Sequence, residues 1–439
     1  MGADMNADLA RMVKDKGIEY LFFSFTDLFG VMRSKMVPAR AVQELQKSGA
    51  GFAGFAAHLD MTPAHPDMWA VPDPESLIQI PWQPELGWVA CDLVMDGKPL
   101  DQAPRVVLKR VIEAAAKKGY QMKTGVEAEF FVINPDGSAG ADPLDTQLKP
   151  CYDQMSLLRR SDMIRLICDS MIEMGWNPYQ NDHEDANGQF EMNWEYSDCL
   201  TTADRHTFFK FMVRTLAEKH GLRATFMPKP FPSLTGIGAH IHFSLWNSDG
   251  RKSLFLDESG ELGLSELAYQ FLGGLLHSAE AMCAITNPTV NSYKRINAPV
   301  TLSGATWSPN SITYSGNNRT HMVRIPEAGR FETRLPDGAA NPYLMQAALL
   351  VVGLDGIEAR RDPGKRLDVN MYEEGAALKG VRKLPLNLLD ALRAFDRSKI
   401  LRDGLGDGLV DSYVKLKLLQ WHQFMAQVSP WELENTLDC

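Results

Sequence analysis

The sequence lacks the patterns that mark membrane proteins, zinc-finger proteins and disulfide-stabilised secreted proteins. Its 439 residues contain no apolar run long enough to span a bilayer. The six cysteines form no C-x-x-C pair and show no zinc-finger spacing. The first residues are polar and amphipathic, unlike a secretory leader. We therefore expect a cytoplasmic protein with reduced thiols and no membrane partner.

Basic residues are also scarce relative to acidic ones. The chain has 45 Lys and Arg against 55 Asp and Glu, so its formal net charge is −10. Because phosphate backbones attract proteins with excess positive charge, this balance argues against a nucleic-acid partner. Hydrophobic residues make up 45% and charged residues 23%, which is ordinary for a soluble globular protein.

Two familiar nucleotide-binding loops are missing as well. No G-x-x-x-x-G-K-[ST] sequence occurs, so ATP would not be held by a P-loop. Residues 49–54 fit G-x-G-x-x-G, but they follow a predicted helix rather than a strand, which argues against a dinucleotide site. We find no convincing Ser-His-Asp or Cys-His set, although spacing alone does not exclude a triad.

The length suggests two or three domains. We expect a small β-rich domain over 1–100, with strands at 20–26 and 31–37, and a larger catalytic domain over 101–439. Further predicted strands cover 125–134, 189–195 and 238–246. Predicted helices cover 7–16, 38–46, 102–119, 156–175, 203–220, 264–284, 341–359 and 410–428. This mixture indicates an α+β protein.

Acidic and histidine residues recur on the predicted strands. Glu127 and Glu129 lie two apart, as do His240 and His242, so each pair shares one strand face. Neighbouring carboxylates repel unless a cation lies between them. Taken alone, each short pair is more often a solvated strand face, in about four cases of five.

Three more glutamates join this set. Glu184 and Glu191 flank a predicted Asn-Gly turn, and Glu332 lies between Arg330 and Arg334. Five glutamates and a histidine are oxygen-rich, hard ligands, which favour magnesium or manganese over zinc.

A cluster of arginines accompanies the acidic residues. Its members are Arg295, Arg319, Arg324, Arg330 and Arg334. The planar guanidinium matches carboxylate and phosphate oxygens, and metals with arginines are typical of phosphoryl-transfer sites. The alternative is a surface network of ion pairs.

The order of these segments resembles the glutamine synthetase family over essentially the whole chain. The segments are GVEAEFF, NDHEDANGQFE, FMPKP, GIGAHIHFSLW, NSYKR, NNRTHMVRIP and RFETRLPDGAANPYL. The resemblance implies a small β-grasp N-terminal domain and a larger catalytic domain with a curved antiparallel sheet and flanking helices. It also implies rings of subunits, commonly dodecamers, that share their active sites.

The resemblance also implies roles for individual residues. One metal would be held by Glu129, Glu184 and Glu191, and a second by Glu127, His240 and Glu332, with two or three Mg²⁺ or Mn²⁺ ions per site. Catalytic roles would fall to Arg295, Arg319 and Arg334. Glutamate would contact Arg295, Arg334, Gly236, Gly238 and Asn297. ATP would contact Arg319, Arg324, Arg330, Ser244 and His242.

The chain departs from the family pattern in the region that receives the amine. Asn297 stands where the family has a flap glutamate, and the apolar segment 51–57 stands where it has a loop aspartate. Both carboxylates attract ammonium, whereas Phe52 and Phe55 suit a methyl group. Our hypothesis is therefore that methylamine is the amine and γ-glutamylmethylamide the product, as in one branch of the family.

Other functions stay open at this point. Ammonia is the alternative amine, because one changed group often shifts specificity only modestly. A phosphotransferase related to guanidino kinases and an inactive relative are less favoured, since all six expected metal ligands are intact. Arg382 stands where bacterial relatives carry an adenylylated tyrosine, so we expect no such modification.

Overall fold

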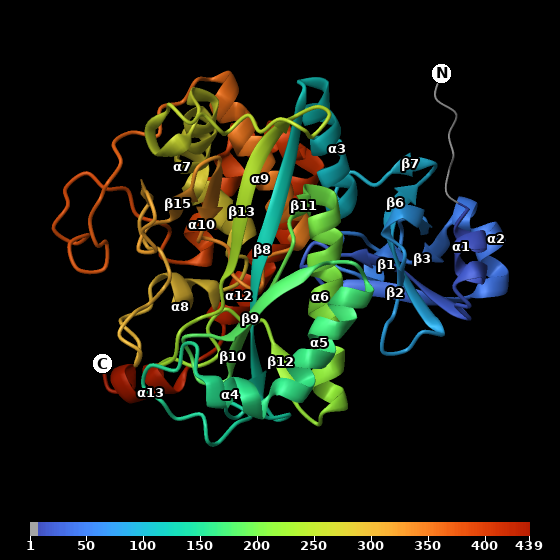
Figure 1. Ribbon diagram of the computed structural model, residues 1–439, viewed down its shortest axis with the longest axis horizontal. Helices are drawn as coiled ribbons and strands as arrows, with labels where there is room; N and C mark the ends of the chain where they lie inside the picture. Colours follow the sequence, from blue (N-terminus) through green and yellow to red (C-terminus); the bar gives the residue numbers. More distant parts are fainter. Residues whose placement is uncertain (1–7) are drawn as a thin grey trace.

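A seven-stranded sheet occupies the N-terminal part of the chain in the computed structural model, which describes residues 8–439. Its main path runs β2-β1-β6-β4-β3, and β5 and β7 also pair with β6. Its strands are β1 (Tyr20–Thr26), β2 (Met32–Pro38), β3 (Ala50–Phe52), β4 (Met68–Pro72), β5 (Ile78–Gln79), β6 (Leu86–Met95) and β7 (Lys98–Pro99). Figure 1 shows them as a lobe on the right of the molecule, beside α1 (Leu9–Asp15) and α2 (Ala39–Ser48).

A nine-stranded sheet forms the centre of the larger lobe. Its main path runs β14-β15-β16-β13-β8-β10-β9, and β11 and β12 pair with β8. Its strands are β8 (Tyr120–Ile133), β9 (Pro178–His183), β10 (Gln189–Trp194), β11 (Ser197–Asp198), β12 (Arg223–Thr225), β13 (Ala239–Asn247), β14 (Tyr314–Ser315), β15 (Val323–Glu327) and β16 (Arg330–Thr333). All neighbours are antiparallel except β14 and β15, which confirms the expected α+β class.

Helices surround this second sheet. The longer ones are α3 (Pro104–Lys117), α5 (Ser161–Glu173), α6 (Cys199–Lys219), α7 (Glu266–Thr286), α9 (Pro342–Glu358), α10 (Leu388–Arg397) and α12 (Asp407–Met425). The shorter ones are α4 (Gln154–Arg159), α8 (Ser292–Ile296), α11 (Lys399–Leu405) and α13 (Pro430–Thr436). Three 3₁₀ turns lie at Gly54–Ala56, Pro74–Ser76 and Glu261–Gly263. Within residues 8–439, none of these helices combines the length and the apolar character that crossing a bilayer requires.

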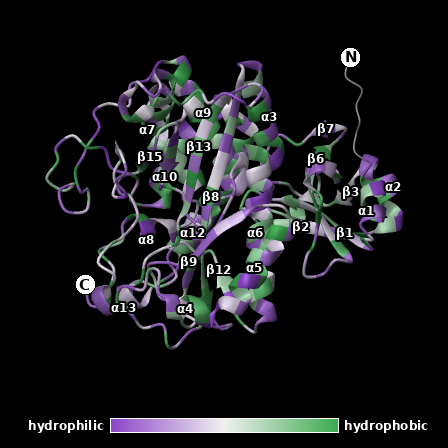
Figure 2. Ribbon diagram, viewed as in Figure 1, coloured by the Kyte–Doolittle hydropathy of each residue, from purple (hydrophilic) through white to green (hydrophobic). Residues whose placement is uncertain are grey.

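The two faces of the central strands have different neighbours, and hydrophilic residues occur among the hydrophobic ones along them (Figure 2). Phe130 of β8 contacts Phe209 of α6, and Phe243 of β13 contacts Phe271 of α7. Because side chains alternate along a strand, the glutamates at 127 and 129 project from the opposite face of the sheet. The helices therefore cover one face and leave the other for polar residues.

Most predicted elements are present, with instructive differences. The predicted helix over 156–175 is two helices, because Arg160 between α4 and α5 has φ −108° and ψ 7°. Strand β8 begins at Tyr120, earlier than predicted. Strands β14 to β16 were missed, since buried charged residues such as Arg324 and Glu332 obscure their hydrophobic alternation.

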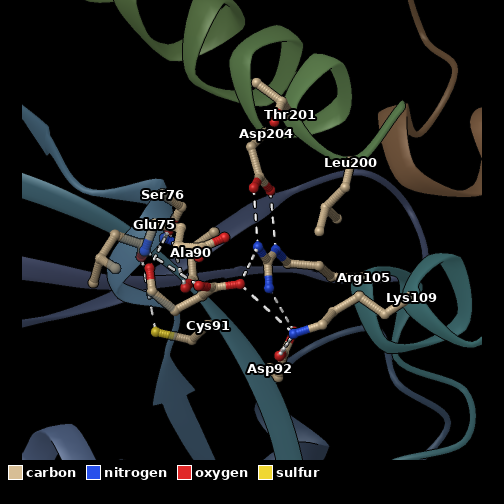
Figure 3. A network of polar contacts seen from close by, with 12 residues as sticks. Glu75, Ser76, Ala90, Cys91, Asp92, Arg105, Lys109, Leu200, Thr201 and Asp204 are labelled. Carbon is tan, nitrogen blue, oxygen red and sulfur yellow. Dashed lines mark hydrogen bonds and ion pairs between the residues drawn. The ribbon is translucent and has the colours of Figure 1, made fainter. Parts of the chain in front are cut away.

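A buried arginine joins the two lobes. Arg105 of α3 donates to Asp92 at 2.7 Å, to Asp73 at 2.8 Å and to both carboxylate oxygens of Asp204 at 3.0 Å. Lys109, one turn later, donates to Asp92 at 2.6 Å. Figure 3 shows Arg105 reaching between Asp204 of α6 and the N-terminal strands. The sheets change between residues 99 and 120, so we propose the domain boundary near residue 101.

Replacing Arg105 with methionine should destabilise the protein by about 3 kcal/mol or more, because the buried Asp204 would lose its cation. Urea unfolding followed by circular dichroism measures this loss. The matched control is Arg393→Met, which removes an exposed pair with Asp390 and should cost at most about 1 kcal/mol. Equal destabilisation by both variants would contradict the proposed contribution of the Arg105 network to the free energy of unfolding.

Candidate functional site

Strand register gathers the charged residues on the uncovered face of the central sheet. The register pairs Asp182 with Glu191, Glu191 with Glu129, Glu127 with His240, His242 with Glu332, and Glu332 with Arg324. These residues come from five adjacent strands, β9, β10, β8, β13 and β16, with β15 at the end of the row. Residues far apart in sequence thus form one continuous polar surface.

Glu127 lies between two histidines. His242 Nε2 lies 2.8 Å from Glu127 Oε1, and His240 Nδ1 lies 3.3 Å from Glu127 Oε2. Burial alone would raise the pKa of Glu127, but hydrogen bonds from both imidazoles hold it well below its ordinary value. Glu127 is therefore a carboxylate that stays ionised.

Glu332 is fully buried between two arginines. Arg324 Nη1 donates to its Oε2 at 2.8 Å, and Arg334 donates to its Oε1. Burial would raise the pKa of Glu332, but the charge of Arg334, followed by that of His240, lowers it to about 2. Glu332 thus keeps its negative charge at neutral pH and orients both guanidinium groups.

Asp182, Glu184 and Glu191 form no ion pair with an arginine or histidine among residues 8–439. Burial, followed by repulsion from Glu129, raises the pKa of Glu184 well above its ordinary value. Burial and repulsion from Glu127 have the same effect on Glu191. The pKa of Asp182 rises to about 6, again through burial and then Glu129. This half of the surface holds more negative charge than the protein itself compensates.

Three observations indicate that these residues fit divalent cations. His240 Nε2 is buried and accepts no hydrogen bond in the described chain. Three groups have ligand atoms within 4.8 Å of one another: Glu127, His240 and Glu332; Glu129, Glu191 and His240; and Asp182, Glu184 and Glu191. Carboxylates with one imidazole are hard donors, as magnesium and manganese prefer. The first group is the predicted second-metal set, whereas Glu184 is grouped with Asp182 instead of Glu129.

A cavity of about 140 Å³ contains these acids and opens beside arginines. Arg295 and Arg334 line it, and Arg295 is held by the carbonyls of Leu335 at 3.0 Å and Arg334 at 3.2 Å. A Cβ on Gly238 would lie 2.5 Å from His240 Nε2, and one on Gly236 would lie 2.6 Å from Pro228 O. Only glycine leaves this space free at both positions.

A larger cavity of about 700 Å³ adjoins the acidic one. Glu127, Gln180, Arg319 and Arg324 line both cavities. The predicted nucleotide contacts Arg330, Ser244 and His242 line the larger cavity, with Lys123 Nζ 4.0 Å from the centre of the Trp246 ring. An elongated ligand can therefore reach from the larger cavity to the acidic residues past two arginines.

Three predicted contacts do not line the acidic cavity of this chain. Asn297 uses its side-chain amide to bond the carbonyls of Tyr293 at 2.9 Å and Leu386 at 3.0 Å. Phe52 lines a separate hollow on the N-terminal sheet, and Phe55 is 51% exposed. Neither phenylalanine lines the acidic cavity of its own chain.

Seven residues that line this cavity were not predicted from the sequence, and Asp182, Trp307 and Tyr152 are among them. Asp182 lies two residues before Glu184, and the same period-of-two argument would have placed it on this face. Trp307 and Tyr152 add aromatic rings and adopt left-handed conformations, with φ 55° and 65°. Trp307 Nε1 donates to Asp185 at 2.6 Å, which fixes the indole at the cavity. No sequence pattern marks such loop contacts.

The sequence and the fold are similar to those of known proteins. Residues 101–436 match the family described as glutamine synthetase, catalytic domain. A glutamine synthetase from Rhizobium leguminosarum bv. phaseoli is 60% identical over 99% of this chain and 100% of its own length. A glutamate–methylamine ligase from Methyloversatilis universalis is 41% identical over 98% and 99%. A solved structure described as a GmaS/ADP complex is 61% identical, with TM-score 0.95 over 98% and 100% of the two chains.

The raised pKa values predict how magnesium stabilises the protein at different pH. Asp182 titrates near pH 6 when folded but near pH ~3.9 when unfolded, so without metal the folded state loses stability as pH rises through this range. Magnesium binds the ionised carboxylates, so its stabilisation should grow from pH ~4.5 to pH ~7. Melting temperatures with magnesium or with a chelator measure this growth.

The matched control for that experiment is Glu184→Gln, which removes one of the repelling carboxylates. It should reduce the dependence of the magnesium effect on pH. An equal rise in melting temperature at both pH values would count against a cation among these acids.

Proposed function

Because the chain belongs to the glutamine synthetase family, we propose that it joins methylamine to the γ-carboxylate of glutamate. The chain is an ATP-dependent glutamate–amine ligase, and the family requires a divalent metal. The observation that carries the choice of amine is the lining of the acidic cavity. It combines carboxylates with the rings of Tyr152 and Trp307.

The reaction has two balanced steps. A γ-carboxylate oxygen of glutamate attacks the terminal phosphorus of ATP, which forms γ-glutamyl phosphate and releases ADP. The amine nitrogen then attacks the γ-carbonyl carbon, phosphate leaves, and the nitrogen gives up a proton. Phosphorylation is needed because an unmodified carboxylate has no good leaving group. Excluding water prevents hydrolysis of the acyl phosphate.

The arginines supply fixed positive charge for the first step. Arg295 and Arg334 are oriented by backbone carbonyls and by Glu332, so they would bind the substrate carboxylates and the transferred phosphoryl group. Arg319 and Arg324 line both cavities and would contact the phosphates of ATP. Preorganised guanidinium groups need no rearrangement when negative charge moves.

The three acidic groups would hold two or three magnesium or manganese ions. When bound, such ions neutralise charge on the phosphates and polarise the phosphoryl oxygens. The fit of Glu127, His240 and Glu332 supports this proposal, because the free His240 Nε2 and the ionised carboxylates are ready ligands.

A methylammonium ion presents a positive nitrogen and an apolar methyl group. Asp182, which is not one of the six predicted metal ligands, would attract the nitrogen and accept its proton, while the indole of Trp307 would contact the methyl group. Asp182 is anchored opposite Glu191 by strand register.

Ammonia is the second candidate, favoured by the names of two relatives. The Rhizobium proteins that are 60% and 57% identical to this chain are both named glutamine synthetase. Ammonium is smaller than methylammonium and would fit the same carboxylates.

We further propose cytoplasmic rings of subunits, such as dodecamers, with active sites shared between neighbours. The exposed Phe55 and the hollow around Phe52 support this arrangement, because these apolar residues do not reach the cavity of their own chain. In a ring, they would add an apolar wall to the neighbour's amine site.

A panel of amines tests the proposed substrate. With ATP, magnesium and glutamate, phosphate release should be faster with methylamine than with ammonia, and kcat/KM should be about tenfold higher. Ethylamine serves as the size control. A clearly higher kcat/KM for ammonia would overturn the choice of amine while leaving the ligase reaction intact.

Replacing Trp307 with leucine should weaken selection of the methyl group. We expect kcat/KM for methylamine to fall about fivefold to tenfold, with little change for ammonia, because only the methyl group would lose apolar contact with the indole. The matched variant Asp182→Asn should instead raise KM for both amines. A proportional loss for both amines in Trp307→Leu would show that the indole has only a structural role.

A further inference from the structure

A second cavity, of about 640 Å³, lies away from the acidic surface, between the N-terminal hairpin and the helices. The turn at residues 29–32 closes one side, and α6 closes another. Thr207, Lys210, Phe211 and Arg214 of α6 line it with helical spacing, so they share one helix face. Its volume lies within the range of small-molecule sites.

The lining is cationic and apolar, and within residues 8–439 it includes no aspartate or glutamate. Its charged residues are Lys210, Arg214 and Lys417, and its walls include Phe29 and Phe226. Lys210 and Arg214 both lie over the Phe226 ring, at 5.4 and 5.3 Å. The ammonium of Lys417 lies 4.1 Å from the centre of the Phe29 ring. Positive charge therefore gathers here in a protein whose net charge is negative.

The two lysines bond neutral partners. Lys417 is only 2% exposed, and its ammonium donates to Gln420 Oε1 at 3.1 Å. Lys210 donates to the carbonyl of Gly338 at 2.7 Å. Burial lowers the pKa of each ammonium to about 7. Asp337 acts on both lysines and Asp27 acts on Lys417 from outside the lining, but burial outweighs these charges. An anion in the cavity would therefore add counter-charge that these buried groups lack.

We propose that this cavity binds a small organic oxyanion, with its carboxylate or phosphate group among Lys210, Arg214 and Lys417 and its apolar body against Phe29 and Phe226. Charge-assisted hydrogen bonds from two lysines and a guanidinium supply affinity, and the absence of lining carboxylates among the described residues supplies selectivity for anions.

Residues that line this cavity adjoin the segments that hold Arg295 in the active site. Gly338 lines the cavity and follows the segment whose carbonyls, at Arg334 and Leu335, hold Arg295. Asn291 also lines the cavity and begins α8, the helix that carries Arg295. An anion that draws Lys210 from the Gly338 carbonyl would loosen this segment. It would thereby raise KM for glutamate, a consequence that rests on the proposed function.

Calorimetry on the full, metal-free chain tests binding independently of activity. Sodium succinate and sodium sulfate are the separate probes, at constant ionic strength. We expect Lys417→Met and Lys210→Met to weaken binding about tenfold or more, because each removes a charged hydrogen-bond donor. Lys417→Arg keeps the charge and should retain binding. Lys399→Met, on an exposed helix pair with Asp403, is the matched control and should bind as the parent does.

The two probes distinguish the chemical classes. Binding of succinate alone assigns a carboxylate ligand, and binding of sulfate alone assigns a phosphate-like one. Equal binding by the parent and both methionine variants would place the anion elsewhere, for instance in the glutamate site, and would overturn the proposal. Failure of both probes to bind the parent would overturn it too.

A kinetic measurement separates this proposal from the proposed function. With the bound probe, KM for glutamate should rise in the parent protein and stay constant in Lys417→Met. Absence of ligase activity would defeat the proposed function, yet calorimetry would still decide whether the cavity binds anions. Binding without any change in KM would overturn the connection through residues 334–338.

Discussion

Electrostatic repulsion among carboxylates on one sheet face is the constraint on which this structure depends. Glu129, Glu184 and Glu191 are held close together by strand pairing and a tight turn, although burial and neighbouring carboxylates raise the pKa of Glu184 and of Glu191. Folding overcomes this repulsion because helices cover the opposite face and bury aromatic residues such as Phe130 and Phe243. The hydrophobic face thus stabilises a polar face that needs cations.

Arginines compensate this negative charge at one end of the surface but not at the other. Arg324 and Arg334 flank Glu332, so one end of the surface is paired within the chain. At the other end, Asp182 and Glu191 have no arginine partner within the described part of the chain, so external cations would have to compensate their charge. One sheet therefore presents a place for metals and an amine beside a place for phosphates, which is the arrangement that a two-step ligase requires.

The N-terminal lobe is tied to the catalytic lobe through polar contacts. Arg105 bridges three aspartates from both lobes, and Asn341, which caps α9, donates to the carbonyl of Asp27 at 2.9 Å. The second contact adjoins the cationic cavity, because Pro342 and Phe29 both line it. Movement between the lobes would change this cavity and the residues 334–338 together.

The local periodicities could be read from the amino-acid order alone. This order placed Glu127 with Glu129 and His240 with His242 on shared strand faces, and it located most long helices, because these patterns depend only on neighbouring residues. The pairing of the strands and their register, which place Asp182 opposite Glu191, follow only from the three-dimensional fold. It alone brought Trp307 to the acidic cavity and left Asn297 outside it. Register and loop positions arise from contacts between distant segments, which no local pattern encodes.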